Sequence, residues 1–328
     1  MRQDTTINRL PFVSVVIPAH DEAQYISDCI ESVWNAGYPR DRLEVLVIDH
    51  ASTDATPDLA VQAGASVLSL TTGRIGKVRN TGLMTARGEY VAYVDADCLV
   101  PDTWLSSAIA ILQKNPLIGA VGGPCLSPEG GTWIETGLAP CAVDCGVTRP
   151  STTLATSSFI ARTSLLREIG GFDERLISGE DDDMSNRIRQ RGFALSWSSD
   201  CHIIHRGYPQ TWQDLIKKEI WHGSNHIEVR SGLDLTLMLA LVFIVAIFSL
   251  CAFAPYALLR PGPLTIGGLV ATAILVSAPP LLYAMKRISQ RPRDWPFFAH
   301  FIGVGFGYFL GHGIGILGNG WRRLRQEP

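Results

Sequence analysis

The sequence predicts an α/β domain with a mostly parallel sheet, followed by a C-terminal membrane region of transmembrane helices. Short runs rich in Val and Ile alternate with segments of helical length over the first 100 residues, which is typical of βαβ units. Polar and acidic side chains follow directly where several of these runs end. After residue 234 charged residues become rare and long apolar runs begin, which indicates membrane-spanning helices.

Charge divides the 328-residue chain into two parts. Residues 1–234 contain 20 Lys and Arg and 29 Asp and Glu, a net charge of −9. Residues 235–328 contain 8 basic and 2 acidic residues, a net charge of +6, so the whole chain carries −3. The acidic N-terminal part argues against a protein that binds nucleic acid. The hydrophobic content of 46% excludes an intrinsically disordered chain.

The first strand is predicted at 12–18, a short apolar run that lies between prolines. A helix over 21–36 follows it, because apolar residues recur at Ile26, Ile30 and Val33. The same alternation continues along the chain, with Thr56 as the expected N-cap of the second helix. The further elements we expect are strands at 44–48, 66–70 and 90–94 and helices at 57–63 and 75–86.

Acidic residues lie at the carboxyl ends of these strands, where parallel sheets bind their ligands. Asp49 ends the second strand, and Asp95 and Asp97 follow the fourth. Two carboxylates two residues apart repel each other unless a cation joins them. Carboxylates suit Mg²⁺ or Mn²⁺, so the pair indicates a metal site, although an isolated Asp-x-Asp is also a common pattern without one.

Four consecutive acidic residues, Glu180 to Asp183, begin a predicted helix further along the chain. Acidic residues complement the dipole at a helix N-terminus, but four together exceed what a cap needs. A carboxyl group among like charges has a raised pKa and suits a general base. The seven cysteines, odd in number and without a Cys-x-x-Cys spacing, indicate free thiols.

Six short stretches together resemble the family 2 glycosyltransferases of the GT-A fold, a Rossmann-like fold. They occur in the family's order and cover residues 14–187, although each stretch alone is weak. The stretches are SVVIPAHDE (14–22), VIDHASTD (47–54), VRN (78–80), YVDAD (93–97), GGFDE (170–174) and EDDD (180–183). One departure is Asp49-His50-Ala51, where the family often has Asp-Asp-Gly.

The resemblance implies a role for each matching residue. Asp181 is the expected catalytic base, and Asp97 and His205 are the expected metal ligands for Mn²⁺ or Mg²⁺. The residues expected to bind the nucleotide sugar are Pro18, Ala19, Glu22, Asp49, Lys77, Arg79, Asn80, Asp95 and Glu180.

The implied activity is transfer of a sugar, with inversion, from a nucleotide-diphosphate sugar, most often a UDP-sugar in this family, to a hydroxyl group. The expected acceptor is a lipid-linked or growing polysaccharide, and membrane lipids are further partners. One alternative is a polyprenyl-phosphate glycosyltransferase, whose acceptor phosphate needs no base. Another is a catalytically silent membrane scaffold with the same fold. Nucleic acid is not an expected partner.

We expect three parts along the chain: a glycosyltransferase domain at 1–206, an amphipathic interfacial linker at 207–234 and a membrane region at 235–328. Two spans are expected at 235–259 and 263–285, each long enough to cross a hydrocarbon core of ~30 Å. A third hydrophobic segment at 296–318 is richer in Gly. It is expected either to span the membrane or to be re-entrant.

Basic residues predict the orientation of these spans. The link after the second span carries Lys286, Arg287, Arg291 and Arg293, whereas the link before it carries only Arg260. Cytoplasmic loops are enriched in Lys and Arg. We therefore expect a multi-pass membrane protein with a cytoplasmic catalytic domain, as in a bacterial inner membrane.

Overall fold

A computed structural model of the chain describes residues 10–140, 142–229, 235–290 and 292–324. Its contacts divide the chain into two compact units. The first unit comprises Met1–Leu126 and Ala142–Gly207, and the second comprises Ser127–Cys141 and Tyr208–Pro328. Residues 127–141, which we predicted within the first domain, thus group with the C-terminal unit.

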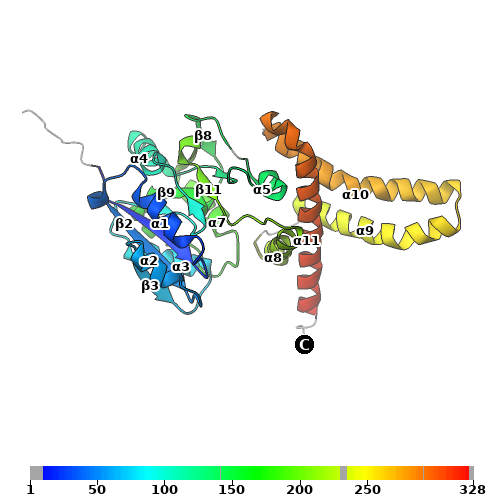
Figure 1. Cartoon of the computed structure of the whole chain (residues 1–328), viewed down its shortest axis with the longest axis horizontal. Coiled ribbons are helices and arrows are strands. Elements are labelled where there is room, and N and C mark those ends of the chain that lie inside the picture. Colours follow the sequence, from blue (N-terminus) through cyan, green and yellow to red (C-terminus); the bar gives the residue numbers. More distant parts are fainter. Residues whose placement is uncertain (1–9, 141, 230–234, 291, 325–328) are drawn as a thin grey trace, which may run out of the picture. The chain divides into compact units, whose positions relative to one another are not determined.

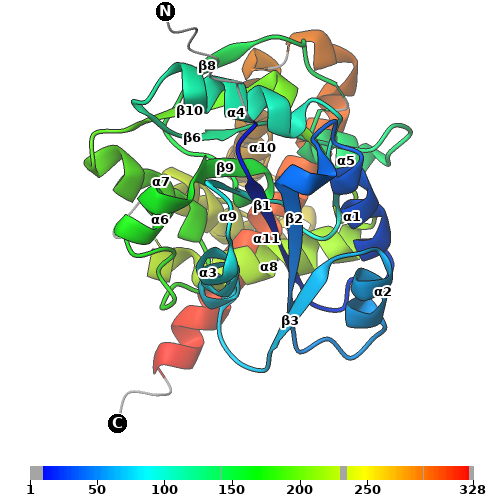
Figure 2. The ribbon, with the colours of Figure 1, turned by 90° about the vertical axis from the view of Figure 1, so that its left-hand side faces the viewer.

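The first unit contains an eight-stranded sheet in the order β3-β2-β1-β4-β9-β6-β10-β8 (Figure 2). The parallel pairs are β1 with β2 and β4, β2 with β3, and β6 with β10. Strand β9 runs antiparallel to β4 and β6, and β8 to β10. The predicted mostly parallel sheet is therefore confirmed. The strands are β1 Val13–Ala19, β2 Leu43–His50, β3 Ser66–Leu70, β4 Tyr90–Tyr93, β6 Ile118–Gly122, β8 Thr148–Ser151, β9 Phe159–Arg162 and β10 Ala194–Ser198.

Helices cover both faces of this sheet, so its central strands are apolar on both sides. Val13, Val15 and Ile17 of β1 belong to the core cluster that includes α1 and α4. Val16, which points to the other face, belongs to the cluster that includes α3, α6 and α7. The helices are α1 Ile26–Trp34, α2 Thr56–Gln62, α3 Ile75–Thr85, α4 Trp104–Lys114, α6 Thr163–Glu168 and α7 Glu180–Gln190, with 3₁₀ turns at Arg40–Arg42, Thr156–Ser158 and Ser199–Cys201.

Two predicted helix starts were wrong. Helix α1 begins at Ile26 and not at residue 21, because Asp21 has a φ of +53°, which is not helical. The Asp21 carboxylate accepts the N–H of Thr53 at 2.6 Å and so joins the ends of β1 and β2. Thr56 is the first residue of α2 and does not cap it. Its hydroxyl donates to Asp54 and accepts the N–H of Glu22 instead.

A second, three-stranded sheet lies in the first unit, in the order β5-β11-β7. Its strands are β5 Cys98–Leu99, β7 Cys125–Leu126 and β11 Ile203–His205. In the antiparallel pair of β11 with β5, His205 lies opposite Cys98. The small sheet therefore brings a histidine from late in the sequence to the residues that follow β4.

The second unit consists of helices, among them the three longest apolar helices described (Figure 1). Candidate membrane spans, by length and composition, are Met238–Leu259, Pro263–Ser289 and Asp294–Gly318. Helices α9 and α10 pack side by side. Helix α8 packs against α11. The helices are α5 Trp133–Leu138, α8 Trp212–Val229, α9 Leu235–Leu259, α10 Pro263–Gln290 and α11 Phe298–Leu324, with a 3₁₀ segment at Pro292–Phe297.

The glycines of α11 are contact points with its neighbours. A Cβ atom added at Gly307 would lie 2.5 Å from Trp212, and one at Gly313 would lie 2.0 Å from Ile244. Small residues let membrane helices approach closely. In the candidate span Asp294–Gly318, more than half of the most apolar 18-residue stretch is buried, whereas in Pro263–Ser289 the share is 11%. The lower hydrophobicity of this segment thus reflects helix packing, and its helix is continuous in the region described.

Candidate active site

A pocket of about 250 Å³ lies at the carboxyl ends of the central strands of the first unit. It is lined by the end of β1 and the residues after it, the last residue of β2, the first turn of α3, the residues after β4 and one residue of β11. Six of the lining residues were predicted from the sequence: Pro18, Ala19, Glu22, Asp95, Asp97 and His205. Five were not: His20, His50, Ile75, Val78 and Ala96. The pocket therefore joins segments that are nearly 190 residues apart in the sequence.

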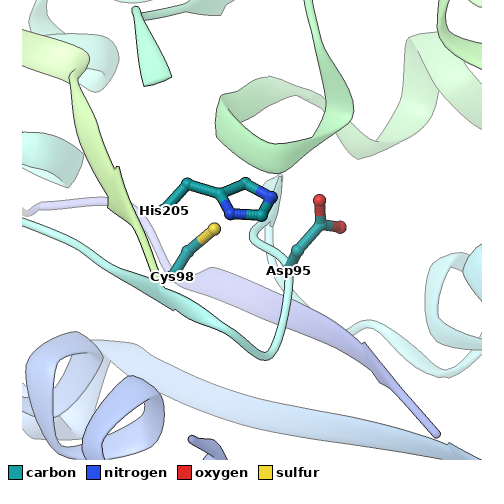
Figure 3. Close-up of side chains that lie close together, drawn as sticks. All are labelled: Asp95, Cys98 and His205. Carbon is teal, nitrogen blue, oxygen red and sulfur yellow. The ribbon is translucent and has the colours of Figure 1, made fainter. Parts of the chain in front are cut away.

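Donor atoms suited to a divalent cation gather on one side of this pocket. His205 Nδ1 lies 3.6 Å from Asp97 Oδ2, and both side chains are mostly buried. A Mg²⁺-type ion lies about 2.1 Å from its ligands, so two ligand atoms of one ion are at most about 4.2 Å apart. The pair meets this limit. Ligand atoms of Asp95, Cys98 and His205 also lie within 4.8 Å of one another (Figure 3).

Cys98 is a member of this group that the sequence analysis missed. Burial, and then the charges of Asp95 and Asp97, raise the pKa of its thiol well above the usual value. The thiol is therefore neutral at physiological pH and a weak ligand in the metal-free protein. Cys98 is paired with His205 across β5 and β11, and this pairing brings its thiol to the acidic group.

The loop after β11 closes over Asp97. The N–H of Arg206 donates to the backbone oxygen of Asp97 at 2.9 Å. A Cβ atom added at Gly207 would lie 1.9 Å from Asp97 Oδ2. Because this oxygen belongs to the carboxylate that faces His205, the loop can pass only with glycine at 207. Sequence reasoning assigned no role to this glycine.

Arg79 connects the pocket to the acidic start of α7. Its guanidinium lies 2.5 Å from Glu180 Oε1 and 3.3 Å from Asp95 Oδ1, and only 5% of the residue is exposed. Burial alone lowers the pKa of Arg79, but Asp95, Glu180 and Asp181 together raise it above its usual value. The ring of Phe172 also packs against the guanidinium, 5.8 Å away. Arg79 is thus a buried cation held by carboxylates from two segments.

The structure places the remaining predicted nucleotide-sugar residues outside the pocket lining. Asn80 is bound by its side chain to the backbone N–H and oxygen of Phe172 and to Glu174. This arrangement fixes the turn that precedes α7. Asp49 is buried and accepts the N–H of Ser52, and Lys77 is half-buried on α3.

Asp181 differs from its neighbours in its electrostatic surroundings. Burial, and then the charges of Glu180 and Asp182, raise the pKa of Asp181 from 3.8 to about 6. Asp182 instead accepts the hydroxyl of Thr153 at 2.6 Å, and Asp183 pairs with Arg187 at 2.7 Å. Of these three residues, Asp181 therefore has the carboxyl group best suited to take up a proton near neutral pH.

A second carboxyl group with an unusual pKa lines the pocket. Burial, and then Asp97, Asp95 and Asp54, raise the pKa of Glu22 to about 7. The pocket therefore concentrates negative charge where strands β1 and β4 end. Such a site attracts a divalent cation, which would offset the repulsion between these groups.

The departure from the family's Asp-Asp-Gly pattern has a structural correlate. Ala51 has a φ of +56°, a left-handed conformation that glycine adopts more easily. His50 lines the pocket where the family often has a second Asp. Its backbone oxygen lies 2.7 Å from Nδ1 of His20, which also lines the pocket. Two imidazoles thus take the place of a carboxylate at this edge.

Comparison with known protein families identifies the chain. The model "Glycosyl transferase family group 2" matches residues 90–286, and "Glycosyl transferase family 2" matches residues 14–160. The chain belongs to the family 2 glycosyltransferases. Its sheet order and its acidic pocket agree with the GT-A fold, and the enzyme is a glycosyltransferase.

Curated relatives include glycosyltransferases of archaea and bacteria. The Haloferax volcanii protein "Glycosyltransferase AglE" is 29% identical over 256 residues, which are 75% of this chain and 82% of that protein. The "Beta-monoglucosyldiacylglycerol synthase" of a Nostoc species is 26% identical over 236 residues, 66% of this chain but 48% of that protein. The glycosyltransferase thus spans only about half of some of its relatives.

Solved structures share the fold at lower identity. The mannosyltransferase PcManGT from Pyrobaculum calidifontis, in complex with GDP-Man and Mn²⁺, superposes with a TM-score of 0.58 at 20% identity. The match covers 96% of this chain and 88% of that one. Residues 1–349 of S. aureus TarS, in complex with UDP-GlcNAc, give a TM-score of 0.51 at 20% identity and cover 95% and 92%.

The raised pKa of Asp181 predicts a pH-dependent effect on stability. The folded-state pKa, about 6, exceeds the usual 3.8, so the native state binds the proton more tightly and loses stability as the pH rises from about 4 to 6. The penalty reaches up to ~3 kcal/mol above that window. We expect Asp181→Asn to raise the apparent Tm of the full-length, metal-free protein by several degrees at pH 8 and by progressively less toward pH 4.

Thermal unfolding in detergent with a chelator measures this difference. Asp41→Asn is the matched control, because Asp41 has a side chain that is 79% exposed and should give no pH-dependent change. A constant difference between wild type and Asp181→Asn at all pH values would contradict the raised pKa.

Proposed function

We propose that the protein is a membrane-anchored inverting glycosyltransferase that moves a sugar from a nucleotide-diphosphate sugar, a UDP-sugar, to a hydroxyl group of a lipid-linked or growing glycan. The observation that carries this proposal is the bridge from Asp95 through Arg79 to Glu180. It ties the proposed donor pocket to the proposed base, Asp181, which follows Glu180 directly. A displacement in one step needs both groups in one site.

The residues divide into three proposed roles. Asp97 and His205 hold the divalent cation, Mn²⁺ or Mg²⁺, which when bound neutralises charge on the leaving diphosphate. Asp181 removes the proton from the acceptor hydroxyl as the hydroxyl oxygen attacks the anomeric carbon of the donor sugar. The proposed nucleotide-sugar residues are Pro18, Ala19, Glu22, Asp49, Lys77, Arg79, Asn80, Asp95 and Glu180. Arg79, Asn80 and Asp49 would act mainly by positioning neighbours, since the first two have partners within the fold and Asp49 is buried.

A hydroxyl acceptor is favoured over a phosphate acceptor by the surroundings of Asp181. A phosphate oxygen is already ionised and needs no base, whereas a hydroxyl must lose its proton. The carboxyl group with a pKa of about 6 is suited to that task. Burying it costs stability, which is consistent with a catalytic role.

The membrane location is proposed from the second unit. Its three candidate spans would anchor the transferase to a membrane that contains the acceptor lipid. The basic link after α10 would place that link and the catalytic unit on the cytoplasmic side, as in a bacterial inner membrane. Nucleotide sugars would then reach the pocket from the cytosol.

Asp181→Asn should lower kcat about 10²–10⁴-fold, the usual contribution of general base catalysis. Donor affinity should change little, because the base acts only in the transition state. Single-turnover transfer at saturating UDP-sugar measures the effect. Asp182→Asn and Asp183→Asn are matched controls, because those carboxylates already bind Thr153 and Arg187.

The three Asn variants also separate the possible outcomes. Equal losses in all three would mean that the acidic cluster acts only through its total charge. A mild effect of Asp181→Asn would instead indicate an acceptor that is already ionised, such as a polyprenyl phosphate.

Asp97→Ala should abolish the dependence of nucleotide binding on Mn²⁺. A ligand that binds only the folded state raises its stability by mass action, so UDP with Mn²⁺ should raise the Tm of wild type but not of the variant. Asp41→Ala, which removes an exposed carboxylate just before the amino end of β2, the end opposite His50, should keep the full shift. An unchanged Mn²⁺-dependent shift in Asp97→Ala would remove Asp97 from the metal site.

Reporter fusions test the proposed orientation. Tags at the N-terminus and between residues 286 and 293 should both report the cytoplasm, and a tag at 260–262 should report the opposite side. The reason is the four-to-one ratio of basic residues between the two links. A cytoplasmic signal from the tag at 260–262 would mean that the first two candidate helices do not cross the membrane.

A further inference from the structure

The second unit contains a cavity of about 610 Å³ that has no part in the proposed sugar-transfer chemistry. Residues of five helices line it, from α5, α8, α9, α10 and α11. Most of its wall is apolar and includes Leu138, Leu239, Leu282 and Phe309. Three of the five helices are candidate membrane spans. An apolar recess in such a setting is suited to a hydrocarbon chain.

The cavity also has a cationic side. Lys286 and Arg287, near the C-terminal end of α10, both line it. The Arg287 guanidinium receives support from Tyr283, whose hydroxyl accepts hydrogen bonds from Nη2 at 2.9 Å and Nε at 3.2 Å. Among the described residues, Lys286 has no carboxylate partner. Lysine and arginine at a helix end often extend to the membrane surface, but Arg287 is folded back over the Tyr283 ring, 5.1 Å away.

A polar path continues from these cations into the interior of the unit. The ring of Tyr283 lies 5.6 Å from that of Tyr308, which stacks on His312 at 4.9 Å. His312 Nδ1 in turn lies 3.2 Å from Glu219 Oε2, with both side chains about 5% exposed. The Glu219 carboxylate, which also lines the cavity, therefore has a buried partner.

We propose that this cavity binds the lipid phosphate of the acceptor, with the phosphate at Lys286 and Arg287 and the first part of the hydrocarbon chain along the leucines. Charge complementarity supports an anionic headgroup, because residues 235–328 carry a net charge of +6. The proposal rests on the proposed function, since it names the part of the acceptor that the second unit recognises. The sugar hydroxyl that reacts is a different part of that molecule.

Two features favour an acceptor lipid over the surrounding bilayer lipid. Bulk lipid contacts the outward faces of helices, where Leu258 and Leu264 are more than 80% exposed. The cavity is instead a recess lined by residues of five helices, with Lys286 and Arg287 in its wall. One of these, α5, belongs to the segment 127–141 that leaves the transferase unit directly after β7. A segment inserted in the sequence of the catalytic unit thus contributes a residue, Leu138, to the wall of this lipid site.

The first test measures binding without any donor sugar. Full-length protein in phosphatidylcholine nanodiscs is titrated with farnesyl phosphate, and farnesol and inorganic phosphate serve as probes that lack one half of the ligand. Only farnesyl phosphate should bind tightly. Lys286→Gln and Arg287→Gln should each weaken its binding roughly ten- to hundredfold, the range for loss of one charge-assisted hydrogen bond.

The controls separate the cavity from the total charge of the link. In Lys286→Gln/Ser289→Lys the link keeps its charge, and hence its expected orientation, but the ammonium moves to an exposed position outside the cavity lining. This variant should bind as weakly as Lys286→Gln. Arg260→Ala, which removes a cation from the α9–α10 link, should bind as wild type does. Lys286→Arg should restore binding.

The second test measures transfer to a lipid-linked acceptor and to the same sugar acceptor without its lipid. The Gln variants should raise the KM for the lipid-linked acceptor about tenfold or more with little change in kcat, and leave transfer to the lipid-free acceptor unchanged. Wild-type rates of donor hydrolysis in all variants would show that the transferase unit is folded.

Three outcomes would overturn the inference while leaving the proposed function intact. One is unchanged binding of farnesyl phosphate in the Lys286 and Arg287 variants. Another is full rescue of binding by the Ser289→Lys change in the double variant. The third is equal competition by phosphatidylglycerol at the same mole fraction, which would make the cavity a general site for anionic bilayer lipid. The absence of any transfer or hydrolysis of UDP-sugars by wild type would count against the proposed function alone.

Discussion

The transferase unit depends on one buried cation, the guanidinium of Arg79. It comes from α3 and meets carboxylates from two other segments, Asp95 after β4 and Glu180 at the start of α7. A buried charge without partners costs several kcal/mol, whereas a buried pair can be sustained. Removing Arg79 would leave two carboxylates close together at the pocket. The positions of the pocket floor and of α7 are therefore coupled through this residue.

This coupling also explains why neighbouring acids differ in their chemistry. Glu180 and Asp181 are adjacent at the N-terminus of α7, but the direct ion pair with Arg79 goes to Glu180. Asp181 lacks such a pair, and burial together with the charge of Glu180 raises its pKa to about 6. The arginine thus pairs directly with one carboxylate, and the charge of that carboxylate in turn raises the pKa of the next residue, Asp181. Two adjacent carboxyl groups thus have different electrostatic surroundings because of their order along one helix turn.

Much of the pocket could be predicted because it depends on local patterns. Apolar runs located the strands, and the parallel arrangement placed Asp95 and Asp97 at a shared edge. The start of α1 could not be predicted in this way, since Asp21 takes a left-handed conformation to bind Thr53, a contact across 32 residues. Cys98 and Gly207 were missed for a similar reason. Their roles depend on the pairing of β5 with β11, two short strands with no periodic signal.

The composition of the membrane segments predicted how long their helices are, but it did not predict how these helices pack against one another. Gly307 and Gly313 lower the hydrophobicity of the third segment, and the same glycines allow α8 and α9 to approach α11 closely. A buried pair, Glu219 with His312, also lies within this group of helices. Such groups are costly in an apolar environment unless they are paired or functional. The hydrophobicity of α11 is therefore reduced because small and polar residues form its contacts with the neighbouring helices.

Chain connectivity relates the two units at the small sheet. The chain leaves the transferase unit directly after β7, and it leaves again after Gly207, two residues beyond the last residue of β11, His205. Two of the three points at which the chain passes between units thus follow strands of the sheet that carries Cys98 and His205. A strand held by only two paired residues on each side resists displacement weakly. The strand that carries His205 is therefore held by few backbone pairs and ends two residues before the chain leaves the transferase unit.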